Sequence, residues 1–290
     1  MSGAEQYSYA RYLRSKRTVD DRALNRAVMD AALGALDTSR CLEVAELGGG
    51  VGTMVDRLMA DGRISSANYV LVDAEAEFVE EVEALVPTWR EGTTRMGPTD
   101  ARFRVSSHRE RIEDWSKKDD EVYDLIIAHA VLDLVDIPTV LPSLLARLAP
   151  GGVFWTTINF DGETIFIPRV DGEARLMEAY HRSMDERETG AGSSTTGREL
   201  FGHIPAAGGR VLRAGSSDWV VHGTPGGYEA DEAYFLHHIV HTVENELGPH
   251  PELGAQVRDW GRQRHAQVER GELVYIAHQL DFAVVRAGAE

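Results

Sequence analysis

A glycine-rich turn between an apolar run and a helical pattern constrains this chain more than any other feature. The apolar run over residues 41–47 predicts a buried strand, and residues 54–59 follow with helical periodicity. Three glycines alternate with other residues between these segments, at Gly48, Gly50 and Gly52. Glycines at such a junction tolerate positive φ and let a ligand approach the backbone closely. The turn therefore predicts a ligand site at the edge of an α/β sheet.

The spacing of the glycines separates two classes of cofactor. A dinucleotide-binding turn reads G-x-G-x-x-G, and its third glycine would fall at a position that Thr53 occupies here. An acid, Glu46, stands two residues before Gly48 instead. A second predicted strand, residues 68–72, ends at Asp73. An acid in that place is positioned to accept hydrogen bonds from ribose hydroxyls.

Three further segments continue the alternation of strands and helices. Residues 101–106 predict a third strand, which leads to two acids, Glu113 and Asp114. Residues 123–134 predict a fourth strand and the turn after it. Residues 144–158 predict a helix, a stop at Pro150-Gly151-Gly152 and a fifth strand.

The acid and glycine turn, Asp73, the fourth-strand turn and the L-x-P-G-G step resemble the class I S-adenosylmethionine (SAM) methyltransferases over residues 41–160. The resemblance implies SAM as cofactor and S-adenosylhomocysteine (SAH) as product. It implies that Asp73 holds the ribose, and that Glu113 or Asp114 contacts the adenine amino group. The cofactor-binding residues that it implies are Glu46, Gly48, Gly50, Gly52, Asp73, Ala74, Glu113, Asp114, Ala128 and His129.

The expected fold is α/β, a seven-stranded doubly wound sheet with an antiparallel last strand. Residues 210–221 predict the sixth strand and residues 273–285 the last one. Residues 1–40 predict an N-terminal helical lid or, equally, a helix packed on the sheet edge, ahead of a methyltransferase domain over residues 41–290. Two helical insertions, at about 160–208 and 227–271, are expected above the carboxyl edge of the sheet, where open α/β sheets bind ligands.

Composition limits the partners. The 30 basic and 47 acidic residues give a net charge of −17, which repels nucleic-acid phosphates. The sequence contains no apolar run long enough for a spanning helix, and its single cysteine is Cys41, so we expect a cytoplasmic protein without a membrane partner. A monomer and a homodimer are equally allowed. Five cations near the N-terminus form a local basic run, from which one or two are expected to reach the SAM carboxylate: Arg11, Arg14, Lys16, Arg17 and Arg22.

The reaction needs little from the protein beyond alignment and the exclusion of water, because the methyl group of SAM is already electrophilic. A base is needed only if the acceptor must lose a proton. His181 is the preferred candidate for that base, His238 is the second, and Glu232 is a candidate acceptor for an indole N–H. No metal site is expected, since no zinc-ligand spacing occurs.

Aromatic side chains around the expected pocket favour a small organic acceptor, with an indole-type natural product as one example. The N-terminal tyrosines and the segment around Ser183 resemble bacterial natural-product methyltransferases. The candidate acceptor contacts are Tyr9, Tyr12, Asp133, Asn159, Phe160, Tyr180 and Phe235. Two alternatives stay open: a SAM-binding regulatory protein without catalysis, and a nicotinamide oxidoreductase on the same type of sheet.

Overall fold

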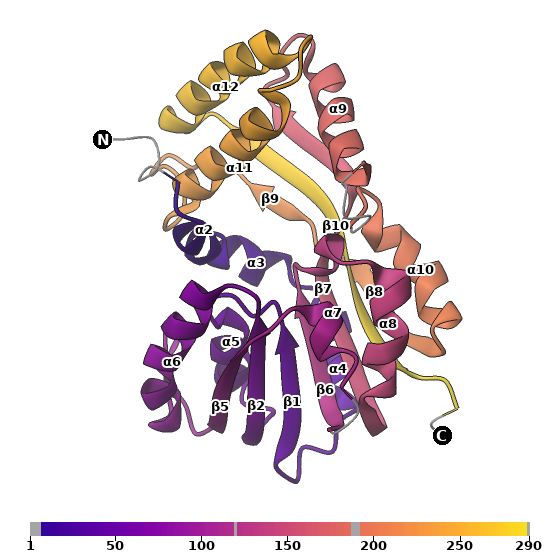
Figure 1. Ribbon diagram of the computed structural model, residues 1–290. Coiled ribbons are helices and arrows are strands. Elements are labelled where there is room, and N and C mark those ends of the chain that lie inside the picture. The colour runs from indigo at the N-terminus through magenta and orange to yellow at the C-terminus, as the bar shows by residue number, and fades with distance from the viewer. Residues whose placement is uncertain (1–6, 119–120, 187–191, 289–290) are drawn as a thin grey trace.

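A computed structural model describes residues 7–118, 121–186 and 192–288, so the first six residues of the expected lid lie outside the described part. Its central sheet contains eight strands: β1 (Leu42–Leu47), β2 (Ser66–Asp73), β5 (Arg102–Arg109), β6 (Tyr123–His129), β7 (Leu148–Ile167), β8 (Gly209–Ser216), β9 (Trp219–Val221) and β10 (Val274–Arg286). The strand order is β5-β2-β1-β6-β7-β10-β8, and β9 also pairs with β10 (Figure 1). A separate two-stranded ribbon joins β3 (Thr93–Thr94) to β4 (Gly97–Pro98).

The strands from β5 to β7 pair in parallel, whereas β10 runs antiparallel to β7, β8 and β9. This confirms the α/β sheet with an antiparallel last strand. The expected single sixth strand is instead two strands, β8 and β9. Between them the backbone N–H of Ser217 donates to the carbonyl of Gln279, and Asp218 accepts from the N–H of Gln279. These bonds turn the chain, so the sheet has eight strands rather than seven.

Helices cover both faces of the sheet: α4 (Arg26–Gly34), α5 (Thr53–Asp61) and α6 (Ala76–Arg90) on one, and α7 (Ile112–Trp115), α8 (Ile137–Ala146) and α10 (Thr196–Ala206) on the other. Successive strand residues point to opposite faces. In β1, Leu42 and Val44 therefore join the first core, while Ala45 and Leu47 join the second. Burial on both sides explains why these strands read as continuous apolar runs.

The upper half of the molecule is built on an extension of the sheet (Figure 1). Beyond Asn159, β7 continues to Ile167 and pairs with the first half of β10. This extension carries α9 (Glu173–Asp185), α11 (Glu232–Leu247) and α12 (Gly254–Glu269). Asn159 is fully buried, where it accepts a hydrogen bond from Thr156 and donates one to the carbonyl of Leu280. Its amide is thus engaged within the sheet, and its expected contact with the acceptor stays a prediction.

The N-terminal helices divide between the two expected arrangements. Helix α4 packs on the sheet against β8 and β10. Helices α2 (Tyr9–Ser15) and α3 (Arg17–Ala23) lie instead between the sheet and the upper helices (Figure 1). Among the described residues, none of the helices is both long and apolar enough to span a bilayer.

Candidate functional site

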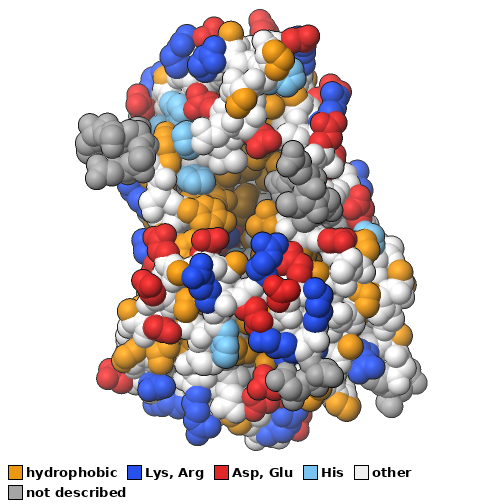
Figure 2. Space-filling view, in the orientation of Figure 1, with side chains coloured by type: hydrophobic (Ala, Val, Ile, Leu, Met, Phe, Trp, Pro, Cys, Tyr) orange, Lys and Arg blue, Asp and Glu red, His pale blue; other side chains and the backbone are white. Residues whose placement is uncertain are grey.

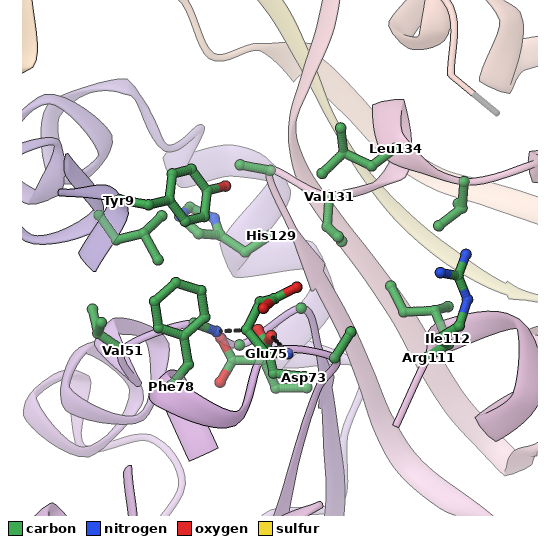
Figure 3. A pocket seen from close by; sticks show the side chains of 18 of the residues that line it. Tyr9, Val51, Asp73, Glu75, Phe78, Arg111, Ile112, His129, Val131 and Leu134 are labelled. Carbon is green, nitrogen blue, oxygen red and sulfur yellow. Dashed lines mark hydrogen bonds between the residues drawn. The ribbon is translucent and has the colours of Figure 1, made fainter. Parts of the chain in front are cut away.

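A pocket of about 280 Å³ opens at the carboxyl ends of β1, β2 and β6, beneath α2 (Figure 3). Its floor is the glycine turn after β1, and its sides come from the turns after β2, β5 and β6. This is the edge at which open α/β sheets bind ligands. Figure 2 shows a hollow between the lower and upper halves of the molecule, with hydrophobic side chains inside it.

The glycine turn leaves no room for side chains. Gly48 has a φ of +61°, and a Cβ there would lie 2.5 Å from Cγ2 of Val131. Gly50 has a φ of +50°, and a Cβ there would lie 2.9 Å from Leu13 of α2. Bare backbone is therefore exposed to the pocket at both positions. Gly52 has a different role: it precedes α5 outside the pocket, where the ring of Trp89 covers it at 2.7 Å from a Cβ position.

Asp73 is held at the end of β2 by two backbone donors (Figure 3). The N–H groups of Gly50 and Glu75 each donate to one of its carboxylate oxygens, at 2.9 Å. Burial raises the pKa of Asp73, although both hydrogen bonds oppose that change. Each carboxylate oxygen has a second lone pair, so the side chain is oriented and can still accept bonds from a ligand in the pocket.

Glu46 is the second acid of the pocket, and it is almost completely buried at 1% exposure. The hydroxyl of Tyr69 donates to it at 2.6 Å. Burial raises the pKa of Glu46 to about 8. The side chain therefore keeps its proton at neutral pH in the free protein, and a cation bound beside it would favour ionisation.

A buried charged cluster ties α3 to the sheet beside the pocket. Asp20 pairs with Lys16 at 2.8 Å, contacts Nε2 of His129 at 3.1 Å and accepts from the indole N–H of Trp219 at 2.9 Å. Burial acts to raise the pKa of Asp20, but Lys16, His129 and Arg57 outweigh it, so its pKa lies below the ordinary value. Burial lowers the pKa of His129 to about 4, which keeps this imidazole neutral at physiological pH.

Apolar side chains form the walls. Figure 3 shows Tyr9, Val51 and Phe78 at one side and Val131 and Leu134 at the other. The ring centroids of Tyr9 and Phe78 lie 5.7 Å apart, so α2 reaches α6 across the mouth. Such walls give the polar groups below an apolar surrounding.

The structure brings most of the expected cofactor residues together. The residues that line the pocket are Glu46, Gly48, Gly50, Asp73, Ala74, Glu113 and His129. Gly52 and two others lie outside its lining. Ala128 is buried within β6, and the side chain of Asp114 is exposed to solvent. Of the two candidate acids after β5, Glu113 thus lines the pocket and Asp114 does not, while Glu110 lines it as well.

The expected acceptor residues lie mostly above the pocket. Tyr9 lines it, while Asp133 belongs to a short 3-10 turn, η1 (Leu132–Leu134), outside the lining. The other four aromatic candidates and two histidines gather between α2, α9, α11 and β7, namely Tyr12, Phe160, Tyr180, His181, Phe235 and His238. Tyr12 stacks on His238 with ring centroids 4.1 Å apart, and Phe160 meets His181 edge-on at 5.5 Å.

Glu232 does not face the pocket, although it was a candidate for catalysis. It is 1% exposed and accepts hydrogen bonds from Arg22 at 2.7 Å and from Thr18 at 2.5 Å. Its carboxylate neutralises a cation of α3, so it joins α11 to the N-terminal helices. In the free protein Glu232 thus has a structural contact, and its expected hydrogen bond with an indole N–H stays a prediction.

The two candidate bases have different surroundings. Nε2 of His181 lies 3.0 Å from the hydroxyl of Thr164, and burial lowers the pKa of His181. Burial also lowers the pKa of His238, to about 4. Both imidazoles are therefore neutral at physiological pH. Among the described residues, no three side chains of the metal-ligating types are grouped as a metal site.

Sequence reasoning did not identify Glu75 or Phe78 as pocket residues, and it selected Lys16 only as one cation among five. Glu75 follows Asp73 by two positions, so its place just after the end of the predicted strand could have identified it. Phe78 lies on the first turn of α6 and is buried against the mouth. Its apolar spacing is also that of an ordinary core residue, so no local signal distinguished it.

Comparison with known proteins gives similarity in structure only. No protein-family model and no curated protein matches the sequence. A candidate methyltransferase from Bacillus halodurans C-125 matches with a TM-score of 0.55 and 11% identity, over 90% of this chain and 97% of that chain. The YcgJ protein from Bacillus subtilis matches with a TM-score of 0.50 and 12% identity, over 91% and 100%.

A SAM-dependent methyltransferase from Thiobacillus denitrificans, solved in complex with SAH, matches at 17% identity with a TM-score of 0.46, over 94% of this chain and 98% of that chain. At such identities a match shows a shared fold. The two Bacillus structures carry that fold over nearly the whole of this chain. The chemistry of the pocket has to be argued from the residues that line it.

Proposed function

We propose, starting from the class I SAM-dependent methyltransferase fold of this chain, that the protein transfers the methyl group of SAM to a small organic acceptor. The observation that carries the proposal is the pocket at the strand ends. Bare backbone lines it at Gly48 and Gly50, because a Cβ there would collide with Val131 or Leu13, and two buried acids face it.

The lining fits the chemical parts of SAM. Asp73, oriented by two backbone N–H groups, would accept from the ribose hydroxyls. Glu113 would accept from the adenine amino group, and Ile112 offers an apolar surface to the ring. Glu46 would face the ammonium group of the methionine portion, where its ionised form is favoured. When bound, SAM supplies a methyl group on a sulfonium, which an aligned nucleophile takes up directly.

The protein then contributes to the reaction by aligning the two reactants and by keeping water away from them. Tyr9 and Phe78 cover the mouth, and Val131 and Leu134 close the opposite wall. A covered, apolar pocket aligns two reactants and removes competing water. No group of the protein has to form a covalent bond.

The acceptor is proposed to be small and aromatic, with indole-type compounds as one class. Support comes from the rings above the pocket, where Tyr12 stacks on Phe235 at 5.8 Å and on His238 at 4.1 Å between ring centroids. Stacking surfaces of this kind suit a flat apolar ring. If the acceptor must lose a proton, neutral His181 is the first candidate to accept it and His238 the second.

A transfer assay tests the proposal. Purified protein is incubated with isotopically labelled SAM and a panel of indoles, tryptophan-containing cyclic dipeptides, phenols and amines, and products are identified by mass. The proposal predicts one product that gains a single labelled methyl group. Tight SAH binding without any methylated product across a widened panel would favour a SAM-binding regulatory protein instead.

The role of His181 is tested separately. If it accepts the proton, His181→Ala lowers turnover by about 100-fold, within the usual contribution of a general base, and leaves SAH affinity unchanged. His203→Ala, on the distant α10, is the matched control and keeps full turnover. Unchanged turnover in His181→Ala would remove this residue from the mechanism.

A further inference from the structure

Lys16 is buried in the wall of the pocket, at the junction of α2 and α3. Only 6% of the residue is exposed, although lysine is rarely buried without a partner. It shares the pocket with Glu46 and His129. Among the described cations of the N-terminal helices, Lys16 is the one that lines the pocket.

The partner of Lys16 leaves part of its ammonium group available. Its Nζ donates to Asp20 at 2.8 Å, and Asp20 is the one acceptor that it reaches within the described residues. An ammonium group has three N–H donors. The carboxylate of Asp20 is also shared with His129 and Trp219, so it does not compensate Lys16 alone.

The other cations of the N-terminal run are engaged elsewhere. Arg11 pairs with Asp231, Arg14 with Glu81, Arg17 with Asp21, and Arg22 with Glu229 and Glu232. None of these four lines the pocket, whereas Lys16 does. The structure thus selects one cation from the five that the sequence left open.

We propose that Lys16 binds the carboxylate of the methionine portion of SAM. The inference rests on the proposed function. The methionine portion carries an ammonium and a carboxylate, and the pocket offers an acid, Glu46, and a cation, Lys16, to match them. Asp20 also contacts His129 of β6 and Trp219 of β9, so the sheet holds the ammonium group of Lys16 in place through Asp20.

Calorimetry with two ligands tests the inference. SAM and decarboxylated SAM differ only in the carboxylate, and both are titrated into the wild-type protein, Lys16→Met and Arg14→Met. We expect Lys16→Met to weaken SAM binding by about 10- to 100-fold, the range of a charge-assisted hydrogen bond, and to change the binding of decarboxylated SAM by less than about threefold. Arg14→Met, which removes an exposed cation from α2, should bind both ligands like the wild type.

A second variant guards against misfolding. Lys16→Arg keeps a cation at the site and should retain SAM affinity within about fivefold, because guanidinium also pairs with carboxylates. If Lys16→Met weakens the binding of both ligands equally, Lys16 supports the structure of the pocket rather than the ligand's carboxylate, which would overturn the inference. Equal affinity of the wild type for the two ligands would also overturn it. A wild-type protein that binds neither ligand would instead overturn the proposed function.

Discussion

The two acids of the pocket show how the surroundings of a residue decide its charge. Asp73 receives two backbone N–H groups, whereas Glu46 receives a single phenol hydroxyl in a fully buried position. Hydrogen bonds to a carboxylate favour its ionised form, and desolvation opposes it. For Glu46 desolvation prevails and raises its pKa to about 8. In the free protein Glu46 is therefore protonated at neutral pH, at the place where the ammonium of SAM is proposed to bind.

The proton on the Glu46 carboxyl group makes ligand binding depend on pH. Below pH 8 Glu46 must release its proton before it can pair with the ligand's ammonium, so SAH affinity should rise from pH 6 to pH 8, by at most about tenfold per pH unit. Glu46→Gln should bind SAH about tenfold more weakly at pH 8 and lose this pH dependence. Isothermal titration at several pH values measures both effects.

The same proton affects stability, with the opposite sign. The folded-state pKa of Glu46 lies above the unfolded value of 4.5, so the folded protein binds more protons between pH 4.5 and 8. This contribution to the unfolding free energy is therefore lost as pH rises through that window. Glu46→Gln should lack it and gain in melting temperature relative to the wild type as pH increases. Identical pH profiles for the two proteins would contradict the assignment.

At the scale of elements, the strand, turn and helix around Gly48 form the unit that the sequence specified best. The apolar run, the glycines and the helical pattern each predict the same local structure, and β1 and α5 are found where they were expected. The two long helices α11 and α12 lie within the helical insertion predicted at about 227–271, because their apolar spacing extends over four turns each.

Other elements could not be predicted from local pattern. Helix α10 lies within the helical insertion predicted at about 160–208, but its bounds could not be predicted, because Gly197, Gly202 and Pro205 interrupt its sequence and its apolar face is specified by packing on the sheet. The extension of β7 beyond Asn159 contains polar residues that resemble a loop, and it becomes a strand through pairing with β10. The contact of Asp20 with His129 joins residues 109 positions apart, so no local signal announces it.

The glycine turn itself is testable by a paired substitution. Gly48→Ala places a Cβ 2.5 Å from Val131 at a φ of +61°, so we expect a loss of about 2 kcal/mol in unfolding free energy and a loss of SAH binding. Gly34→Ala is the control, because no atom lies within 4 Å of its Cβ position, at the last residue of α4. Denaturant unfolding and titration with SAH compare the two. A Gly48→Ala protein that binds SAH normally would show that the glycine turn is not part of the cofactor site.

The contact between α3 and the sheet makes a second prediction at this scale. Asp20→Asn leaves Lys16 buried without a countercharge, so we expect a loss of about 3 kcal/mol and faster proteolysis near residues 15–25. Asp30→Asn, which removes an exposed pair with Arg63, should change stability by less than about 1 kcal/mol. Limited proteolysis and denaturant unfolding report the difference. Equal behaviour of the two variants would mean that the cluster does not hold the N-terminal helices.

At the scale of the whole molecule, an α/β sheet with a pocket at its strand ends lies below an upper half made largely of helices (Figure 1). The chain resembles known structures in fold over 90 to 91% of its length, at 11 to 12% identity. The upper helices and the N-terminal helices enclose the hollow seen in Figure 2, with rings and histidines around it. The residues at the strand ends thus predict the cofactor from the sequence. The acceptor could not be predicted in this way, because its surroundings depend on contacts between segments far apart in sequence.

The most direct test of the central claim, that the pocket at the strand ends is built for SAM, is thermal melting of the wild-type protein with SAH or NAD. A ligand present at 100 times its dissociation constant stabilises a protein by about 2.7 kcal/mol. We predict a rise in melting temperature with SAH and none with NAD, because the turn has Thr53 in place of the third dinucleotide-binding glycine. A protein that NAD stabilises and SAH does not would contradict the account.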